Sequence, residues 1–194
     1  MNVTTLTGQD LRYALPHLAR LRVEVFRDYP YLYDGTLDYE TSYLNALAES
    51  KDSLIVAAEE EGRIVGCATG SALAGHHAEF AAPFRASGLD LNQIFYCGES
   101  VLVPMYRGQG LGHSFFERRE AHAKDHGYKY SAFCAVIRPD SHPLRPANYS
   151  PLDTFWKKRG YREVEGVIAM FRWKDIDQPD ESEHPMQFWM RELL

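Results

Sequence analysis

The sequence has few cysteines and no long hydrophobic run. Its 194 residues include 3 cysteines, each in an apolar stretch and at no regular spacing: Cys67, Cys97 and Cys134. An odd, irregular set of this kind favours reduced thiols and a cytoplasmic protein. The N-terminus lacks a basic stretch followed by an apolar segment, and no apolar run could span a membrane. We therefore expect no signal peptide and no membrane partner.

The sequence also lacks an excess of positive charge. The net charge is −6 at pH 7, whereas a general nucleic-acid binder would show a basic excess, so nucleic acid is not an expected partner. The negative charge permits a cationic substrate without requiring one. There is no internal repeat or low-complexity tract, and the length and the 45% hydrophobic content fit a single domain over residues 1–194.

Apolar periodicity and turn residues predict an alternation of strands and helices. The expected elements begin with a strand at 3–7, a helix from 7–10 to 26 and a helix at 37–49; Pro16 predicts a late start or a kink in the first helix. A hairpin of 53–59 and 63–71 follows, then a connector at 75–88 and a strand at 94–103. The last expected elements are a helix at 111–126, a strand at 130–137, a short helix at 152–158 and a strand at 164–173 that closes the sheet. We expect the remainder, 174–194, to pack back on the domain as an extension.

The stretch 101–112, Val-Leu-Val-Pro-Met-Tyr-Arg-Gly-Gln-Gly-Leu-Gly, organises these predictions. It contains the end of a buried strand, a stop at Pro104, three alternating glycines and the start of a helix. Glycine lets a backbone approach a ligand closely, and the free N–H groups of a first helical turn attract negative charge. With Arg107 as an added cation, this pattern predicts a site for a pyrophosphate.

Two common pyrophosphate motifs do not fit this stretch. A P-loop needs Lys-Ser/Thr after its last glycine, and here His113-Ser114 follows Gly112. A dinucleotide fingerprint needs Gly-x-Gly-x-x-Gly, and here the spacing is Gly-x-Gly-x-Gly. The pattern Arg-x-x-Gly-x-Gly, formed by Arg107, Gly110 and Gly112, resembles the acetyl-CoA loop of the GCN5-related N-acetyltransferases (GNAT). The alternative is a strand-to-helix corner that binds nothing.

The predicted order of elements over about residues 3–173 is also similar to this family. A second segment, Phe155-Trp156-Lys157-Lys158-Arg159-Gly160-Tyr161, resembles the family's Phe-Tyr-Glu-Lys-Leu-Gly-Phe segment, although its usual tyrosine is Trp156 here. The resemblance implies an α/β (α+β) fold with a mixed, mostly antiparallel central sheet flanked by helices. It also implies direct transfer of an acetyl group from acetyl-CoA to a primary amine, by a monomer or homodimer and without a metal.

The resemblance assigns acetyl-CoA to the strand end, the glycine loop and the short helix. The residues expected to contact it are Val101, Leu102, Val103, Arg107, Gly108, Gln109, Gly110, Leu111, Gly112, Asn148 and Trp156. In the family the strands before and after the main helix splay apart, here around Val101 and Ala135, and the pantetheine enters between them. A backbone N–H near Leu102 is then the expected donor to the thioester oxygen.

Two side chains are candidates for proton transfer. Glu99 lies in an apolar strand, and burial favours a carboxyl group that accepts a proton near neutral pH. The alternative for Glu99 is a structural ion pair or an exposed strand end. Tyr149 precedes the short helix and is the candidate acid, since Trp156 carries no titratable proton; its alternative is packing on the surface. Cys134, mid-strand and without an adjacent base, is expected to be a core residue.

The segment 26–35 is unusually aromatic for a loop. In the family the connection between the first two helices lies over the acceptor site, which implies that Phe26, Tyr29, Tyr31 and Tyr33 wall the amine-binding side. Aromatic faces can hold a cation, and Asp28 and Asp34 could add negative charge. The alternative is that these rings pin the loop to the core. The leading function is an N-acetyltransferase for a small molecule or peptide; the alternatives are a non-catalytic acetyl-CoA sensor and a relative that uses another acyl-CoA.

Overall fold

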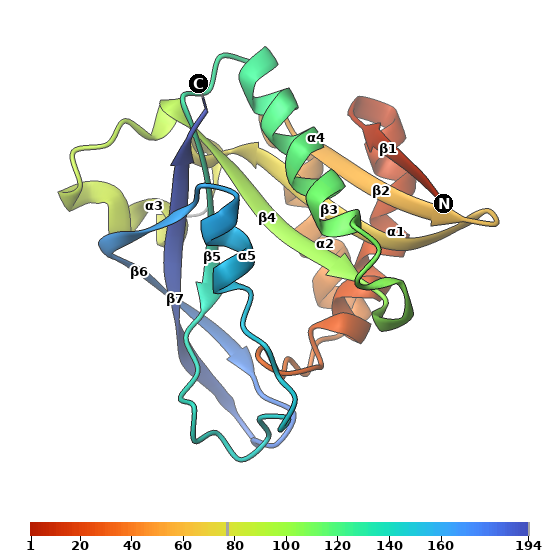
Figure 1. Ribbon diagram of the computed structural model, residues 1–194, viewed down its shortest axis with the longest axis vertical. Coiled ribbons are helices and arrows are strands. Elements are labelled where there is room, and N and C mark those ends of the chain that lie inside the picture. Colours follow the sequence, from red (N-terminus) through yellow and green to blue (C-terminus); the bar gives the residue numbers. More distant parts are fainter. Residues whose placement is uncertain (77, 194) are drawn as a thin grey trace.

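The computed structural model describes residues 1–76 and 78–193, and within them a seven-stranded sheet lies between two layers of helices (Figure 1). The sheet order is β1-β2-β3-β4-β5-β7-β6, and the one parallel pair in it is β4–β5. This confirms the expected mixed, mostly antiparallel sheet. The strands are β1 (Asn2–Leu6), β2 (Leu54–Glu60), β3 (Arg63–Ala72), β4 (Ile94–Leu102), β5 (Tyr130–Val136), β6 (Arg162–Lys174) and β7 (Glu181–Glu192).

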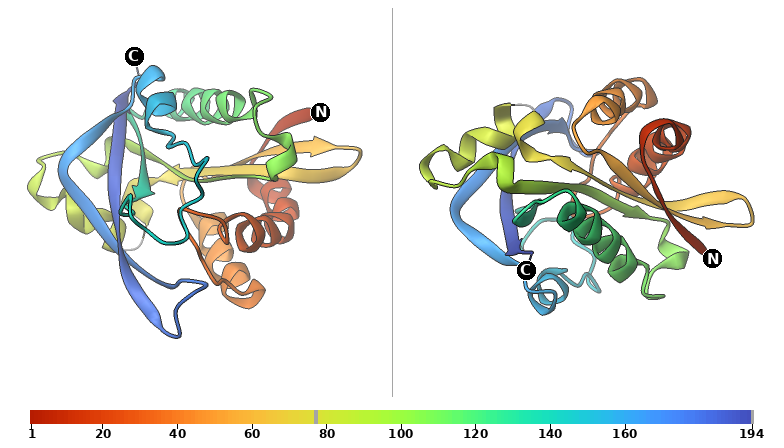
Figure 2. Two further views of the ribbon diagram at one scale, coloured as in Figure 1. Left: turned by 60° about the horizontal axis from the view of Figure 1, so that its bottom comes forward. Right: turned by 90° about the horizontal axis from the view of Figure 1, so that it is seen from above.

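The helices lie on opposite faces of the sheet, α1 and α2 on one and α4 and α5 on the other (Figure 2). They are α1 (Gly8–Val25), α2 (Leu37–Glu49), α3 (Ala78–Ala81), α4 (Leu111–Asp125) and α5 (Asp153–Lys158). Of the two expectations for Pro16, a late helix start is wrong, because α1 begins at Gly8 and contains Pro16. Burial of Leu11, Ala14 and Leu18 around it offsets the hydrogen bond that proline cannot donate. Along the described part of the chain, no helix has the length and hydropathy needed to cross a membrane.

The C-terminal segment corrects one expectation about the sheet. Residues 164–173 were expected to close the sheet, and β6 is its edge strand, but the residues after 173 also form a strand, β7, which lies between β5 and β6 and pairs with both. Phe188 and Trp189 of β7 are buried on its two sides. The residues after 173 are therefore part of the sheet rather than an extension packed on it, because apolar alternation marks a strand without saying which neighbour it pairs with.

A β-bulge in β4 changes which face its side chains occupy. The register with β3 shifts between Ala68 and Gly70, so that Gly98 and Glu99 together oppose Thr69. Phe95 and Cys97, before the bulge, pack in the core beneath α4. After the bulge, Val101 packs in the core beneath α1 and α2, and Glu99 meets Arg22 of α1. The bulge therefore turns Glu99 away from α4 and toward the first two helices.

Candidate functional site

The strands β4 and β5 separate and leave an opening in the centre of the sheet. They pair only from Ile94 with Tyr130 to Tyr96 with Ala132, and beyond these residues the two strands diverge (Figure 1). This confirms the splay expected around Val101 and Ala135. Val103 donates its N–H to Val65, so the neighbouring pair of Leu102 with Gly66 is of the non-hydrogen-bonded kind. The N–H of Leu102 therefore points away from β3, toward the opening.

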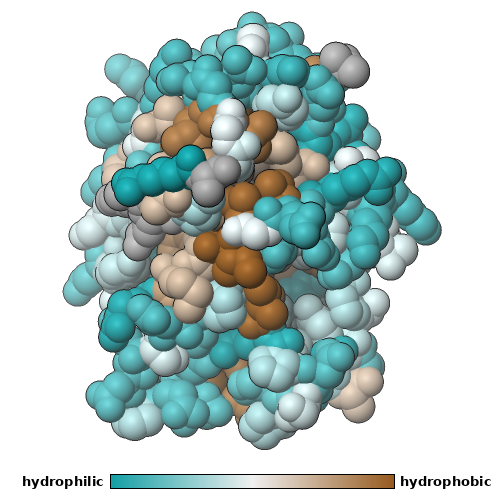
Figure 3. All heavy atoms as spheres, turned by 90° about the vertical axis from the view of Figure 1, so that its left-hand side faces the viewer, coloured by the Kyte–Doolittle hydropathy of each residue, from teal (hydrophilic) through white to brown (hydrophobic). Residues whose placement is uncertain are grey.

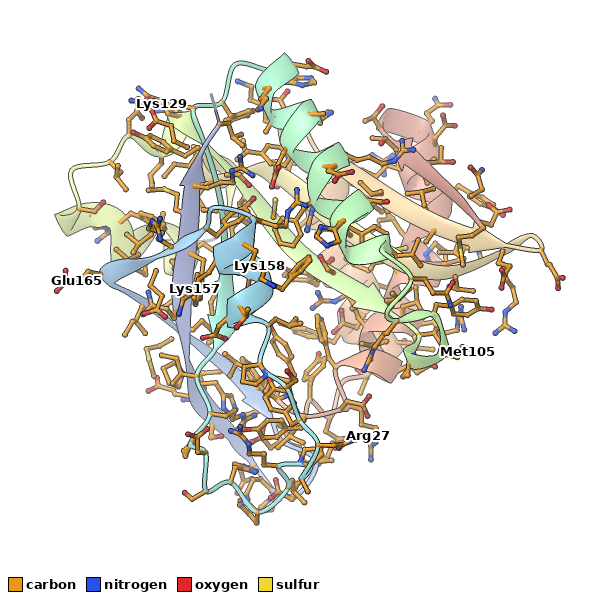
Figure 4. The ribbon with its side chains drawn as sticks, in the orientation of Figure 1. Arg27, Met105, Lys129, Lys157, Lys158 and Glu165 are labelled. Carbon is orange, nitrogen blue, oxygen red and sulfur yellow. The ribbon has the colours of Figure 1, made fainter. Side chains whose placement is uncertain are left out.

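The glycine-rich loop lies at the end of β4 and leads into α4. Gly108 and Gly110 have φ of +78° and +81°, a left-handed conformation that strongly favours glycine. Arg107 and His113 donate their N–H groups to backbone carbonyl oxygens, whereas the N–H groups of 108–112 have no partner among the described residues. These five amides are therefore available to a ligand. They precede a helix of 15 residues, whose N-terminal dipole favours an anion. Met105, at the outer side of this loop, points to solvent and is 75% exposed (Figure 4).

One large, open cleft brings most of the predicted site residues together. Its lining includes Leu102, Arg107, Gly108, Gly110, Leu111, Gly112, Asn148 and Trp156 from the expected cofactor set, with Glu99, Tyr149, Phe26, Tyr29, Tyr31 and Tyr33. The cleft does not include three expected residues. The side chains of Val101 and Val103 pack beneath α1 and α2, and the Gln109 amide is 3.4 Å from the Met105 carbonyl oxygen. At these three positions only the backbone remains as a possible ligand group.

Glu99 is 6% exposed and belongs to a buried charge network. Its Oε2 accepts a hydrogen bond of 2.6 Å from Nη1 of Arg22, whose Nε donates to Glu40. Glu40 is completely buried, and one oxygen of each carboxylate, Oε1, has no partner among the described residues. Burial alone would lower the pKa of Arg22, but the Glu99 and Glu40 carboxylates raise it well above its ordinary value. The network thus holds two carboxylates against one guanidinium, with an unpaired carboxylate oxygen at the cleft wall.

Arg22 and Glu40 were not predicted as members of this network, although their spacing from buried leucines contained a signal. Arg22 follows Leu18 by one helical turn, and Glu40 precedes Leu44 by one turn. Both leucines are fully buried, so a charged residue on the same stripe needs a partner inside the protein. Arg22 also lies against two aromatic rings, 5.0 Å from the centroid of Phe26 and 4.8 Å from that of Tyr43. These contacts fix the guanidinium between the two carboxylates.

Tyr149 lies in the long loop before α5 and is held by an aromatic and a cationic neighbour. Its ring meets Tyr29 edge-on at 4.7 Å, and the Arg145 guanidinium is 5.2 Å from its centroid. Burial and the neighbouring Tyr29 raise the pKa of Tyr149 above its ordinary value, so its hydroxyl keeps its proton at neutral pH. Trp156, by contrast, packs against Phe133 and Trp189 at 4.9 and 5.3 Å and contributes only an apolar wall.

The aromatic segment 26–35 is both a wall of the cleft and firmly docked. Arg138 donates to the carbonyl oxygens of Pro30 and Tyr31 at 2.8 and 2.7 Å, and it forms a buried, two-pronged ion pair with Asp175 at 2.6 and 2.7 Å. Trp173 also donates to Tyr31, at 3.1 Å. The segment can therefore be both a wall of the amine-binding side and an anchor of the loop to the core, because rings whose backbone is held in place can still face the cleft.

The aspartates of this segment do not provide free negative charge. Asp34 accepts hydrogen bonds from Arg27 at 2.9 Å and Lys174 at 2.8 Å, and these two cations lower its pKa. Asp28 lies 3.8 Å from Arg107, which belongs to the glycine loop. The negative charge of Asp34 is therefore offset by two cations. The Glu40–Arg22–Glu99 network, with two carboxylates and one guanidinium, adds net negative charge beside the cleft.

Cys134 also lines the cleft, on β5. The Tyr96 hydroxyl is 3.1 Å from its sulfur, and burial raises the pKa of the Cys134 thiol to about 12. A thiol with so high a pKa carries almost no thiolate at neutral pH, so it is a poor nucleophile. This agrees with the interpretation of Cys134 as a core residue.

Comparisons with known proteins agree with this geometry. Residues 18–145 match the model of the acetyltransferase (GNAT) family, and no curated protein matches the chain in sequence. Ribosomal-protein-alanine N-acetyltransferase from Brucella melitensis superposes over 100% of both chains at 14% identity and a TM-score of 0.61. An N-acetyltransferase from Staphylococcus aureus Mu50 does so at 15% identity and 0.59. The yncA protein of Salmonella typhimurium, solved with its cofactor acetyl-CoA, matches at 12% identity over 100% of this chain and 95% of its own, with a TM-score of 0.60. At these identities the likeness is one of fold.

Proposed function

Because the chain belongs to the acetyltransferase (GNAT) family, we propose that it transfers the acetyl group of acetyl-CoA directly to a primary amine of a small molecule or peptide. The single observation that carries this proposal is the shared cleft. Gly108, Gly110 and Gly112 of the glycine loop, Leu102 and Glu99 all line it, beside the opening between β4 and β5. An anion site, an oxyanion donor and a base are the three parts that such a transfer needs.

The glycine loop fits a pyrophosphate. The backbone amides of 108–112 have no partners among the described residues, and a Cβ built on Gly108 or Gly110 would meet no atom within 4 Å. The glycines are therefore explained by their positive φ rather than by crowding within the protein. We assign the pyrophosphate of acetyl-CoA to these amides and Arg107, and the pantetheine to the opening beside Leu102. Asn148 and Trp156 line the cleft across from this strand.

The first prediction concerns the loop. Gly110→Asp adds a side chain in a left-handed conformation and a negative charge where the phosphates bind, so we expect acetyl-CoA affinity to fall at least about 100-fold, the equivalent of about 2.7 kcal/mol. Calorimetric titration with acetyl-CoA measures this, and Gly110→Ala, which carries the backbone strain without the charge, is the matched control. Equal affinities of the wild type and a folded Gly110→Asp variant would contradict the assignment.

Glu99 is the proposed base. Its unpaired Oε1 accepts the proton of the substrate ammonium, and the neutral amine then attacks the acetyl carbon. As the carbonyl oxygen gains negative charge, the N–H of Leu102 stabilises it by a hydrogen bond that needs no rearrangement of the backbone. The C–S bond breaks as the C–N bond forms, and the sulfur leaves as a thiolate that takes a proton from Tyr149. The second proton, which the nitrogen loses as the amide forms, restores the Tyr149 hydroxyl. The ion pair with Arg22, at 2.6 Å, holds the Glu99 carboxylate in position.

Tyr149 is the proposed donor to the leaving sulfur, and it provides the second prediction. The raised pKa of Tyr149 keeps its hydroxyl protonated at neutral pH. Ionisation of Tyr149 should therefore lower the activity only at a pH above the ordinary titration range of a tyrosine. Tyr149→Phe keeps the contact with Tyr29 and removes the proton, so we expect kcat to fall about 100-fold with an unchanged KM for acetyl-CoA. Full activity of Tyr149→Phe, with Tyr29→Phe as the control, would mean that the thiolate leaves without this acid.

The third prediction concerns the acceptor. We propose that Phe26, Tyr29, Tyr31 and Tyr33 form the wall against which the organic part of the amine packs, since all four line the cleft on the side of Glu99. Tyr29→Ala should raise the amine KM about tenfold, the usual scale for losing one aromatic contact of 1–2 kcal/mol, and leave the acetyl-CoA KM unchanged. If Ala variants at 29, 31 and 33 lower only the melting temperature, the segment is structural.

The experiment that tests the function as a whole is a screen of amines. The protein is incubated with acetyl-CoA and a panel of small primary amines and peptides, and release of free thiol is measured, with product masses to identify N-acetylation. We expect turnover with at least one class of acceptor. Thiol release that is the same with and without every amine would contradict the proposal, and a comparison of acetyl-CoA with longer acyl-CoA esters separates it from transfer of another acyl group.

A further inference from the structure

Glu99 lies between two cavities. Besides the main cleft it lines a second, smaller cavity, on the side of the sheet that faces α2. The cavities share a wall of four residues: Tyr43, Tyr96, Gly98 and Glu99. The remaining lining of the second cavity comes from α2, the end of β3 and the turn after it: Ala46, Leu47, Ser50, Thr69, Gly70, Ser71, Gly75 and His76. The buried Glu99 is thus part of the wall of a second cavity as well as of the main cleft.

The lining of the second cavity includes a hydrogen-bonded pair, Ser71 and His76, on the same side of the sheet as the Glu99 side chain. Thr69 and Ser71 alternate along β3, so their side chains share the face on which Glu99 meets Arg22. The Thr69 hydroxyl accepts the N–H of Glu99 at 3.2 Å, which fixes the bulge beside the cavity. Ser71 is fully buried, and its hydroxyl lies 2.7 Å from Nε2 of His76, which is half-buried at the surface.

We propose that the second cavity is the exit for the proton that Glu99 takes from the acceptor amine, with Ser71 and His76 as its relay. This rests on the proposed function, in which the main cleft is filled by acetyl-CoA and the amine while Glu99 becomes protonated. Glu99 passes that proton to water in the second cavity, and the water passes it to the Ser71 hydroxyl. Ser71 gives its own proton to Nε2 of neutral His76, and the imidazolium releases a proton to solvent. Glu99 is thereby restored as a carboxylate.

The surroundings of His76 suit this role. Its ring lies 4.9 Å from Tyr96 and 5.0 Å from Phe80, so its orientation toward Ser71 is fixed by aromatic packing. Histidine accepts and releases protons near neutral pH, which a serine hydroxyl alone does not. Within the second cavity's lining, His76 is the imidazole and Glu99 is the carboxylate.

The experiment uses His76→Ala and Ser71→Ala in the full chain, assayed with acetyl-CoA and whichever amine of the panel the wild type acetylates. We expect kcat to fall at least about tenfold in both variants, with unchanged KM values, because recharging of the base becomes limiting. Added imidazole should restore the rate of His76→Ala, and a series of substituted imidazoles should restore it more as their basicity rises. His17→Ala, a half-buried histidine of α1 outside both cavity linings, is the matched control.

The outcomes separate the relay from the function on which it rests. A wild type that acetylates no amine contradicts both. A wild type that is active, with His76→Ala indistinguishable from His17→Ala in kcat and in its response to imidazole, contradicts the relay alone. A lowered rate in His76→Ala that imidazole does not restore also contradicts it, because a structural defect has no reason to respond to an added base. Unaltered kcat in Ser71→Ala excludes the hydroxyl from the route.

Discussion

Replacing Arg22 with methionine is expected to destabilise the protein by about 3–5 kcal/mol, since it leaves buried charges uncompensated. Arg22 separates Glu40, which is completely buried, from Glu99, which is 6% exposed, and it pairs with both. Methionine fills a similar volume without a positive charge, so the two carboxylates would repel each other away from water. The loss should be smaller at low pH, where protonation of the carboxylates removes this repulsion.

Denaturant unfolding at neutral and acidic pH measures this effect. Arg12→Met is the matched control, because Arg12 also pairs with a glutamate from α2, Glu49, but both side chains are more than half exposed. An exposed pair of this kind contributes under about 1 kcal/mol. Adding Glu40→Gln and Glu99→Gln to Arg22→Met should recover most of the lost stability. Equal losses for Arg22→Met and Arg12→Met would contradict the buried network.

Glu99→Gln is expected to lower kcat/KM for the amine at least about 100-fold at neutral pH, because it removes the proposed base and keeps the side-chain shape. The variant should fold, since the remaining Arg22–Glu40 pair is neutral as a whole. Its affinity for acetyl-CoA should not change, because the glycine loop and the opening at Leu102 are built from backbone. The rate of the variant should recover partly as the pH rises toward the range where the amine is already unprotonated.

Steady-state kinetics over a range of pH, with calorimetry for acetyl-CoA, checks this prediction. Glu40→Gln is the control, because it removes the other carboxylate bound to Arg22 from a residue that does not line the cleft. We expect Glu40→Gln to change stability more than the rate. A pH–rate profile of Glu99→Gln that coincides with the wild type would remove Glu99 from the mechanism, and Glu99 would then be only a partner of Arg22.

An apolar strip on the face of β6 stays outside the proposed site. Figure 3 shows brown residues among hydrophilic ones on one side of the molecule. Ile168 and Met170 of β6 are among the exposed large apolar side chains. β6 is the edge strand of the sheet, and the apolar residues on its inner face pack in the core. The positions that carry the proposed chemistry lie instead at the centre, where β4 and β5 separate.

The sequence by itself determined most of the helices and strands and the backbone of the glycine-rich loop. Helix α2 has the predicted bounds, Leu37–Glu49, because Thr36 caps its first turn and its leucines repeat at helical spacing. Glu61 and Gly62 both have positive φ and close the predicted hairpin, as a two-residue turn requires. The glycine loop was identified for the same reason, since strand, glycines and helix start are consecutive in the chain and their geometry is local.

The tertiary structure decided the surroundings of Glu99 and the order of the last strands. Strict alternation along β4 places Glu99 on the same face as Phe95 and Cys97, toward α4, and only the bulge opposite Thr69 turns it toward Arg22. A bulge depends on pairing with β3, so β4 alone does not specify it. In the same way, the position of β7 between β5 and β6 depends on partners distant in sequence. Local patterns predict the local backbone, whereas the partners of a buried charge and the neighbours of a strand follow from packing between segments far apart in the chain.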